Sequence, residues 1–264
     1  MKKFLFYLFA FPLFSTVNEP LRCEVFSGYR SDRIHWHLQE PGEGGDLTYS
    51  EIYRNIEYWE NGLVLKVIHR DLTFFLRGAY GAFGRGTVQQ RYPELALQSN
   101  TDGWTADGAG YFGYAINLTA ERTYKVLLTP LIGYSAYFEQ LTRSAISGTL
   151  RLVWNGVFLG GGFTVEPNGR WVLNAGYSYH FMDNRLHTSS VKAKSGNNKG
   201  HTGWAQLDAL VNPLWRIGVG GQIHYFPSRI VDSTVQQGGG DAISQKLKLR
   251  WTSFSGWGQI SRQF

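Results

Sequence analysis

The stretch "LWRIGVGGQIHYF", residues 214–226, decides the fold of this chain. Large apolar side chains recur at alternate positions and leave the positions between them to polar or small residues; the apolar set is Trp215, Ile217, Val219, Ile223 and Tyr225. Strict alternation predicts a β-strand with two different faces. A soluble β-sandwich also alternates. Here, however, the apolar face carries aromatic residues at both ends and the other face carries Arg216, Gln222 and His224, as in a strand of a transmembrane β-barrel.

The same alternation returns in "RWVLNAGYSYHF" (170–181) and "TYKVLLTPLIGYSAYF" (123–138). Counting such segments along the chain predicts ten strands, at 22–37, 48–68, 72–84, 110–118, 123–138, 146–164, 170–182, 201–210, 214–226 and 243–264. An even number of strands leaves both chain ends at the same rim of the barrel. The predicted fold class is all-β, an antiparallel transmembrane β-barrel of about ten strands.

The connections between these segments are of two kinds. Short turns are expected at 69–71, 119–122, 166–169 and 212–213, and they alternate with long polar stretches at 39–46, 85–109, 139–143, 183–200 and 227–242. Short turns at one rim and long loops at the other are typical of outer-membrane barrels.

The N-terminus predicts export. Two lysines and a short apolar run in "MKKFLFYLFAFPLF" (1–14) match a secretory signal peptide, and the run is too short to span a bilayer as a helix. We expect a signal peptide at 1–17, cut between 15 and 20, and one barrel domain at 18–264. A single cysteine excludes an intramolecular disulfide. Basic residues are scattered, which argues against nucleic-acid binding.

The C-terminus, "FSGWGQISRQF" (254–264), ends on an aromatic residue. Phe264 and Ile260 are expected on the lipid face of the closing strand, where the barrel-assembly machinery would recognise Phe264. In a regular strand, the opposite face would carry the apolar residues at odd positions: Leu247, Leu249, Trp251 and Trp257. To bring them to the lipid face, a β-bulge is expected near Gly256 or Gly258. A similar parity slip is expected at Asn61-Gly62.

Charged residues of the polar faces are expected to point into the lumen. The expected set is Glu51, Arg54, Glu57, Lys66, Arg77, Lys125, Arg151, Asp208, Arg216, His224 and Arg250. Such side chains either fill a narrow barrel by pairing with one another or line a narrow channel, and filling is favoured. The histidines have no compact metal-ligand spacing, so no metal and no cofactor is expected.

Three stretches resemble the omptin family of outer-membrane barrels. They are "SEI" (50–52) at the start of a long second strand, "RGAYGAFG" (77–84) in the third, and "VLNAGYSYHF" (172–181) before an acidic, His-containing loop. The resemblance implies a tall ten-stranded barrel of the kind shared by surface proteases and adhesins. The stretches at 204–226 and 247–257 also resemble an outer membrane protein family of the Protochlamydia type.

The omptin resemblance implies two acidic sites across the barrel mouth, Asp-x-Asp-Trp and Asp-x-His. This chain has "NTDGWTADGAG" (100–110), which keeps Asp102 but has Asn100 two residues earlier, and "MDNRLHT" (182–188), in which Asp183 and His187 stand four apart. Asp102, Asp183 and His187 are therefore candidate catalytic residues of an omptin-like, aspartic-type endopeptidase. The favoured function is non-enzymatic: a surface barrel whose extracellular loops bind a host or envelope ligand as an adhesin or structural protein. Lys192, Lys194 and Lys199 are candidates for contact with lipopolysaccharide phosphates.

Overall fold

The computed structural model describes residues 21–39, 47–92, 95–119, 124–143, 148–189, 191–235 and 243–264. The predicted signal peptide at 1–17 lies outside the described residues, as do several predicted loop segments.

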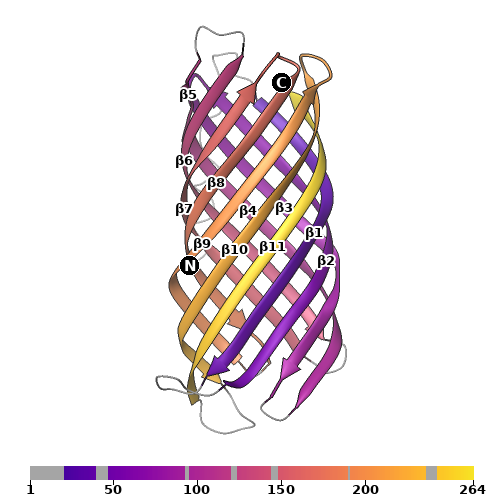
Figure 1. Cartoon of the computed structure of the whole chain (residues 1–264), viewed down its shortest axis with the longest axis vertical. Helices are drawn as coiled ribbons and strands as arrows, with labels where there is room; N and C mark the ends of the chain where they lie inside the picture. Colours follow the sequence, from indigo (N-terminus) through magenta and orange to yellow (C-terminus); the bar gives the residue numbers. More distant parts are fainter. Residues whose placement is uncertain are drawn as a thin grey trace, which may run out of the picture.

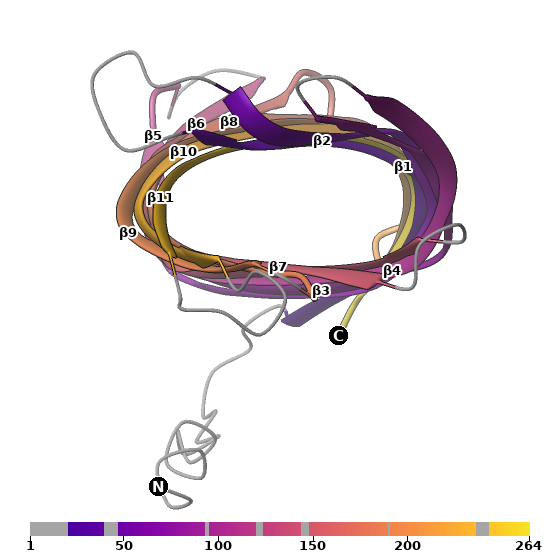
Figure 2. The same ribbon diagram turned by 90° about the horizontal axis from the view of Figure 1, so that it is seen from below.

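Ten long antiparallel strands form a closed barrel (Figures 1 and 2). Their bounds are β1 Leu21–Gln39, β2 Leu47–His69, β3 Leu72–Arg91, β4 Ala96–Tyr114, β6 Lys125–Arg143, β7 Gly148–Glu166, β8 Trp171–His187, β9 Val191–Leu210, β10 Trp215–Val235 and β11 Ile243–Gln263. The two-residue β5 (Ile116–Asn117) follows β4 and also pairs with β6. Pairing of β1 with β11 and of β4 with β6 closes the barrel. The all-β, ten-strand prediction is confirmed.

The strands run steeply along a tall barrel with an oval outline (Figures 1 and 2). One rim holds the short turns at 70–71, 167–170 and 211–214, and the C-terminus lies there too. We call this end the periplasmic rim, because short turns face the periplasm in such barrels. No helix in the described part of the chain is long and apolar enough to cross a membrane.

Most strands are longer than predicted at the opposite, extracellular end. The stretches 85–109, 139–143, 183–200 and 227–242 were expected as loops, but β3 runs to Arg91, β6 to Arg143, β8 to His187 and β10 to Val235. Their alternation was missed because hydrophobic and polar residues exchange faces along the strand.

Near the periplasmic rim the outside of the barrel is apolar. Its exposed side chains include Leu63, Phe74, Phe112, Ile132, Leu159, Phe163, Tyr177, Ile217, Val219, Phe254 and Ile260. On β10 this apolar band runs from Trp215 to Tyr225 and on β6 it ends near Phe138. Its extent matches the ~25 Å lipid-facing band of outer-membrane barrels.

In the extracellular half the faces are inverted. Trp36, Tyr53, Leu141, Leu150, Trp154, Leu247, Leu249 and Trp251 are all buried inside the barrel in one hydrophobic core. The bulge predicted near Gly256 or Gly258 is therefore wrong: over its described residues β11 pairs with β1 in unbroken register. Phe264 and Ile260 do face outward, as predicted. The parity slip expected at Asn61-Gly62 is also wrong, since β2 pairs with β1 and β3 without a shift there.

Glycines make room for the interior rings. A Cβ at Gly176 would overlap the Trp204 indole, and one at Gly62 would overlap the Phe26 ring. In a barrel this narrow, a ring inside can lie flat only where the neighbouring strand has no side chain. The abundance of glycine therefore follows from interior packing as well as from turns.

Candidate functional site in the barrel interior

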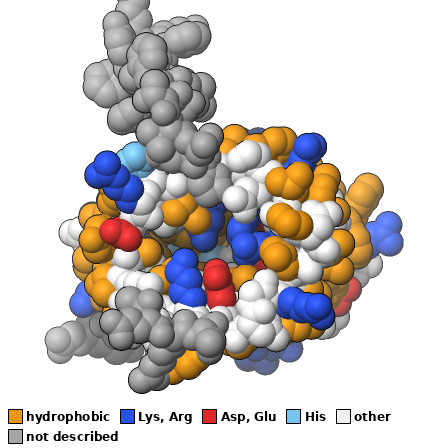
Figure 3. All heavy atoms as spheres, turned by 90° about the horizontal axis from the view of Figure 1, so that it is seen from above, with side chains coloured by type: hydrophobic (Ala, Val, Ile, Leu, Met, Phe, Trp, Pro, Cys, Tyr) orange, Lys and Arg blue, Asp and Glu red, His pale blue; other side chains and the backbone are white. Residues whose placement is uncertain are grey.

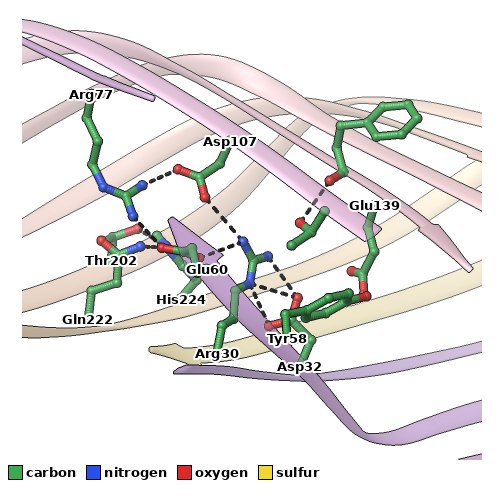
Figure 4. Close-up of polar contacts among 12 residues, drawn as sticks. Arg30, Asp32, Tyr58, Glu60, Arg77, Asp107, Glu139, Thr202, Gln222 and His224 are labelled. Atoms are coloured by element: carbon green, nitrogen blue, oxygen red, sulfur yellow. Dashed lines mark hydrogen bonds and ion pairs between the residues drawn. The ribbon is translucent and has the colours of Figure 1, made fainter. Parts of the chain in front are cut away.

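Arg30, in the middle of β1, lies at the centre of a buried ion cluster (Figure 4). It donates from Nε and Nη2 to both oxygens of Asp32, at 2.8–3.1 Å. Its Nη1 donates to Glu60 Oε2 at 3.4 Å and to Asp107 Oδ2 at 3.2 Å. The guanidinium is also packed against the rings of Tyr58 and Trp251. It is thereby fixed on every side.

Arg77 completes the cluster from the periplasmic side. Its Nη2 donates to Glu60 Oε1 at 2.8 Å and its Nη1 donates to Asp107, so both carboxylates bridge two arginines. The five residues come from the four neighbouring strands β1–β4 and extend into the lumen. Buried charges need such full pairing, because leaving one unpaired is costly.

The extracellular side of the cluster is closed by the hydrophobic core. Trp251 Nε1 donates to Asp32 Oδ2 at 3.2 Å, and Tyr58 donates to Glu139 Oε1 at 2.6 Å. Glu139 Oε2 is buried without a hydrogen-bond partner among the described residues. On the extracellular side of the cluster, the rings of Tyr137, Phe226 and Trp251 pack against one another. Cluster and core together fill the lumen at this level.

A second polar centre lies near the extracellular end. The buried Glu51 carboxylate accepts hydrogen bonds from Trp36 Nε1 at 3.1 Å, Tyr53 Oη at 2.7 Å and Gln90 Nε2 at 2.7 Å, and also from Tyr49 and Arg143. Burial, and then the Glu51 charge, raise the pKa of both Tyr49 and Tyr53, which keeps the phenols protonated as donors. This centre joins β1, β2, β3 and β6.

A cavity of about 120 Å³ lies between the ion cluster and the periplasmic rim. One wall is apolar and includes Phe26, Phe75, Tyr111, Leu131, Phe158 and Trp257. The other wall is polar and is built by β8–β10, with Ser178, His180, Thr202, Gln222 and His224.

The two histidines of this cavity are held by neighbouring side chains. His180 contacts Ser135 Oγ at 3.2 Å and Ser178 Oγ at 2.8 Å, while His224 contacts Thr202 Oγ1 at 2.8 Å and the Gln222 amide at 2.7 Å. These contacts fix both imidazole rings in the polar wall.

The entrance at the periplasmic rim is charged. Seen from this end, the barrel is hollowed, with basic and acidic side chains inside the rim (Figure 3). Arg22, Lys66 and Arg216 occupy inward positions there, and none of them forms an ion pair within 4.0 Å with a residue that the structure describes. Asp208 accepts hydrogen bonds from Gln206 at 2.9 Å and from Gln259 at 2.8 Å.

The three candidate catalytic residues do not line this interior. Asp102 lies within β4, and Asp183 and His187 lie within β8, so all three belong to strands and not to loops at the mouth as expected. Their side chains are exposed on the outer face of the extracellular half. Two strands, β6 and β7, separate Asp102 from the other two. Their catalytic role stays a prediction.

Whether a predicted inward charge does point inward depends on its height in the barrel. Glu51, Lys66, Arg77, Asp208, Arg216 and His224 do point inward, and Lys125 lies at the rim. Arg54, Glu57, Arg151 and Arg250 are exposed on the outside, which corrects their assignment. They lie in the extracellular half, where the faces are inverted. Arg30, Asp32 and Glu60 are not among the predicted inward charges. Each lies two residues from a buried residue of the same face, and that alternation could have identified them.

The outer face of the extracellular half is basic. Among the side chains described there, twelve Lys or Arg residues but only three Asp or Glu residues are exposed or half-buried. Nine of the basic residues lie on the contiguous strands β8–β11, β1 and β2: Arg33, Arg54, Arg185, Lys192, Lys194, Lys199, Lys246, Lys248 and Arg250. We call this set the basic face. In the described ranges, no group of three or more His, Cys, Asp or Glu residues could hold a metal ion.

Comparison with known proteins relates the chain to outer-membrane barrels. No protein-family model and no curated protein sequence matches it. The crystal structure of the outer membrane protease OmpT from Escherichia coli superposes with a TM-score of 0.71 at 10% identity, covering 95% of this chain and 99% of that one. The outer membrane protein OprG from Pseudomonas aeruginosa matches with a TM-score of 0.42 at 10% identity over 93% of this chain and 97% of its own.

At 10% identity the OmpT likeness shows the fold alone. The fold is that of a bacterial outer-membrane β-barrel, and the apolar band around the periplasmic half places the protein in that membrane.

Proposed function

We propose that this protein is a non-enzymatic surface barrel whose basic face binds the phosphates of lipopolysaccharide and whose rigid extracellular half presents loops to host or envelope ligands. The observation that carries the proposal is the excess of basic over acidic side chains on the basic face, which adjoins the apolar band on its extracellular side. Lipid phosphates lie at this height in an outer leaflet.

Basic residues also stand opposite one another across a strand pair. Arg185 on β8 is opposite Lys194 on β9. Like charges directly opposite in a sheet are destabilising. An anion bound between them would relieve that repulsion, and phosphate is the envelope anion with the matching charge and acceptor oxygens.

The filled lumen supports a binding role over a channel. The ion cluster and the core above it leave no described route through the barrel for ions. We therefore expect no conductance above background in planar bilayers at neutral pH. Step-like conductance from the wild-type barrel would favour the channel alternative.

The test of the basic face uses the barrel refolded in detergent and two forms of lipopolysaccharide, one with its lipid A phosphates and one dephosphorylated. Replacing Lys248 and Arg250 together by Gln should weaken binding of the phosphorylated form about fivefold, the effect of losing screened surface charge contacts. Arg85→Gln with Arg91→Gln removes the same charge from β3 and should leave affinity unchanged. Equal binding of both lipopolysaccharide forms would refute the proposal.

Two finer expectations belong to the same proposal. Phe264 is 63% exposed at the periplasmic rim, with Arg262 over its ring, and this exposure supports the expectation that the assembly machinery recognises it. Omptin-like proteolysis rests on sequence resemblance, and a peptide-library digest with wild type, Asp183→Asn and His187→Ala tests it. Cleavage that both substitutions abolish would support the protease in place of the non-enzymatic function.

A further inference from the structure

The cavity on the periplasmic side of the ion cluster is a second candidate binding site, separate from the basic face. We propose that it binds a small carboxylate with an apolar body, such as one aromatic ring or a short alkyl chain, that enters from the periplasmic rim. The ring or chain lies in the cavity and the carboxylate lies toward Lys66, Arg22 and Arg216 at the entrance.

The size of the cavity limits the ligand. Its volume of about 120 Å³ is close to that of the engineered apolar cavity of ~150 Å³ that takes up benzene. A single ring or a chain of a few carbons fits, whereas a fused ring system does not. Elsewhere the described interior is filled by the core and the ion cluster, so this is a local departure from close packing.

The apolar wall suits a ring. Phe75 and Tyr111 stack with centroids 4.5 Å apart, and Phe26 and Trp257 meet at 5.7 Å on the other side. Aromatic faces and edges of this kind bind another ring in offset or edge-on contact. Arg77 closes the cavity at its inner end, and its guanidinium is already bound by Glu60 and Asp107. The carboxylate therefore has no free charged partner at that end.

The basic residues at the entrance select for a negatively charged ligand. Phe26 lies four residues from Arg22 along β1, and Val64 of the cavity lies two residues from Lys66, so the basic positions are nearer the rim on the same inward face. The acidic groups at this level are Glu24, Asp208 and Glu166. Glu24 also lines the cavity, and its Oε2 accepts a hydrogen bond from Gln259 at 3.5 Å. Asp208 is held by Gln206 and Gln259, and Glu166 is opposite Lys125. Without ion pairs of their own among the described residues, Arg22, Lys66 and Arg216 attract an anion to the mouth.

The polar wall can accommodate a polar substituent on the apolar body of the ligand. The Gln222 amide and the Thr202 and Ser178 hydroxyls line the cavity; each contacts a histidine and has further donor or acceptor positions of its own. They can solvate a polar substituent on the ring without a new buried charge. The pocket therefore combines one apolar wall, a few polar groups and a basic entrance, which is the composition of small-ligand sites.

The experiment measures binding of benzoate to the full barrel refolded in detergent, by calorimetry and by ligand-observed NMR. Benzyl alcohol, which has the same ring without the charge, and acetate, which has the charge without the ring, are the controls. We expect benzoate to bind at least about fivefold more tightly than either, the effect of one charge contact or one buried ring.

Variants locate the site. Ala109→Phe fills the cavity and should abolish benzoate binding, while Lys66→Gln should reduce benzoate affinity about fivefold and leave benzyl alcohol unchanged. Lys125→Gln, at the same rim but opposite Glu166, is the matched control and should bind as wild type. Heat-modified gel mobility verifies that each variant is folded.

Three results would overturn the proposal. They are no benzoate binding to the folded wild type, equal affinity for benzoate and benzyl alcohol, and binding that survives Ala109→Phe. The proposal holds if benzoate binding is selective, is lost in Ala109→Phe and is weakened in Lys66→Gln but not in Lys125→Gln.

Discussion

Arg30 connects three carboxylates that would otherwise repel one another inside the barrel. Asp32, Glu60 and Asp107 all lie within hydrogen-bond reach of its guanidinium, and its side chain is 2% exposed. The sequence predicted paired charges in a narrow lumen and named Arg77, but it did not predict which residues pair. Pairing depends on the relative stagger of four strands, and no single strand encodes that stagger.

Replacing Arg30 by Met should destabilise the barrel by about 3–5 kcal/mol, because it leaves buried carboxylates without their cation. Urea unfolding in detergent, followed by tryptophan fluorescence, measures this loss. Arg33→Met removes an exposed arginine three residues away and should change the unfolding midpoint little. A similar loss in both variants would contradict a special role for Arg30.

His37 should make stability depend on pH below neutrality. Burial, followed by the neighbouring charges of His35, Lys248 and Arg250, lowers the pKa of His37 from 6.5 to about 4. Because the unfolded chain binds the proton more readily, stability should be constant above pH 6.5 and should fall as pH drops from 6.5 toward 4. His37→Gln should reduce this fall in unfolding midpoints measured between those pH values. An identical pH profile in the variant would show that His37 does not contribute.

The strands show where sequence patterns succeed and where they do not. β10 was predicted at 214–226 because its lipid-facing half alternates with apolar residues outside, yet it continues to Val235. β11 was predicted over its whole length, but with a bulge to explain Trp251 and Leu249. Both errors have one cause. Alternation shows that a strand has one apolar and one polar face, but it does not show which face points outward. Once a strand leaves the membrane, its apolar residues turn inward.

Strand glycines should tolerate substitution only where no ring lies over them. Gly176 on β8 faces the lumen, whereas Gly161 on β7 faces outward like its exposed neighbours Leu159 and Phe163. A Cβ at Gly176 would meet the Trp204 indole, whereas a Cβ at Gly161 meets nothing within 4 Å. Gly176→Ala should lower stability by about 1–3 kcal/mol through overpacking, and Gly161→Ala should be neutral. Comparison of their urea midpoints tests this, and equal midpoints would contradict it.

At the scale of the whole molecule, the barrel has two halves with opposite faces. The closed ten-strand fold and its short-turn rim could be predicted from the sequence, since both follow from local alternation and turn residues. The ion cluster and the cavity could not, because each is built from side chains of four or more strands. The predicted site residues Asp102, Asp183 and His187 followed a family pattern for loops, and the extended strands place them on the outside.

The division between halves predicts where an outward charge is tolerated on one strand. Ile132 and Thr142 both face outward on β6, Ile132 within the apolar band and Thr142 above it. Ile132→Arg should cost about 2–4 kcal/mol in lipid bilayers, as for arginine near the bilayer midplane, and Thr142→Arg about 0–1 kcal/mol. Unfolding in vesicles measures both costs. Equal costs would contradict the assigned membrane boundary.

The inverted faces also give the two halves different thermal behaviour. The core around Trp36, Trp154 and Trp251 is buried away from water, and such burial carries a large heat-capacity change and weakens on cooling. The outward residues near the periplasmic rim exchange protein contacts for lipid contacts and carry little of that change. The heat-capacity change of unfolding should therefore arise mainly from the extracellular half. On cooling, that half should lose its packing first, while the strands in the membrane remain paired.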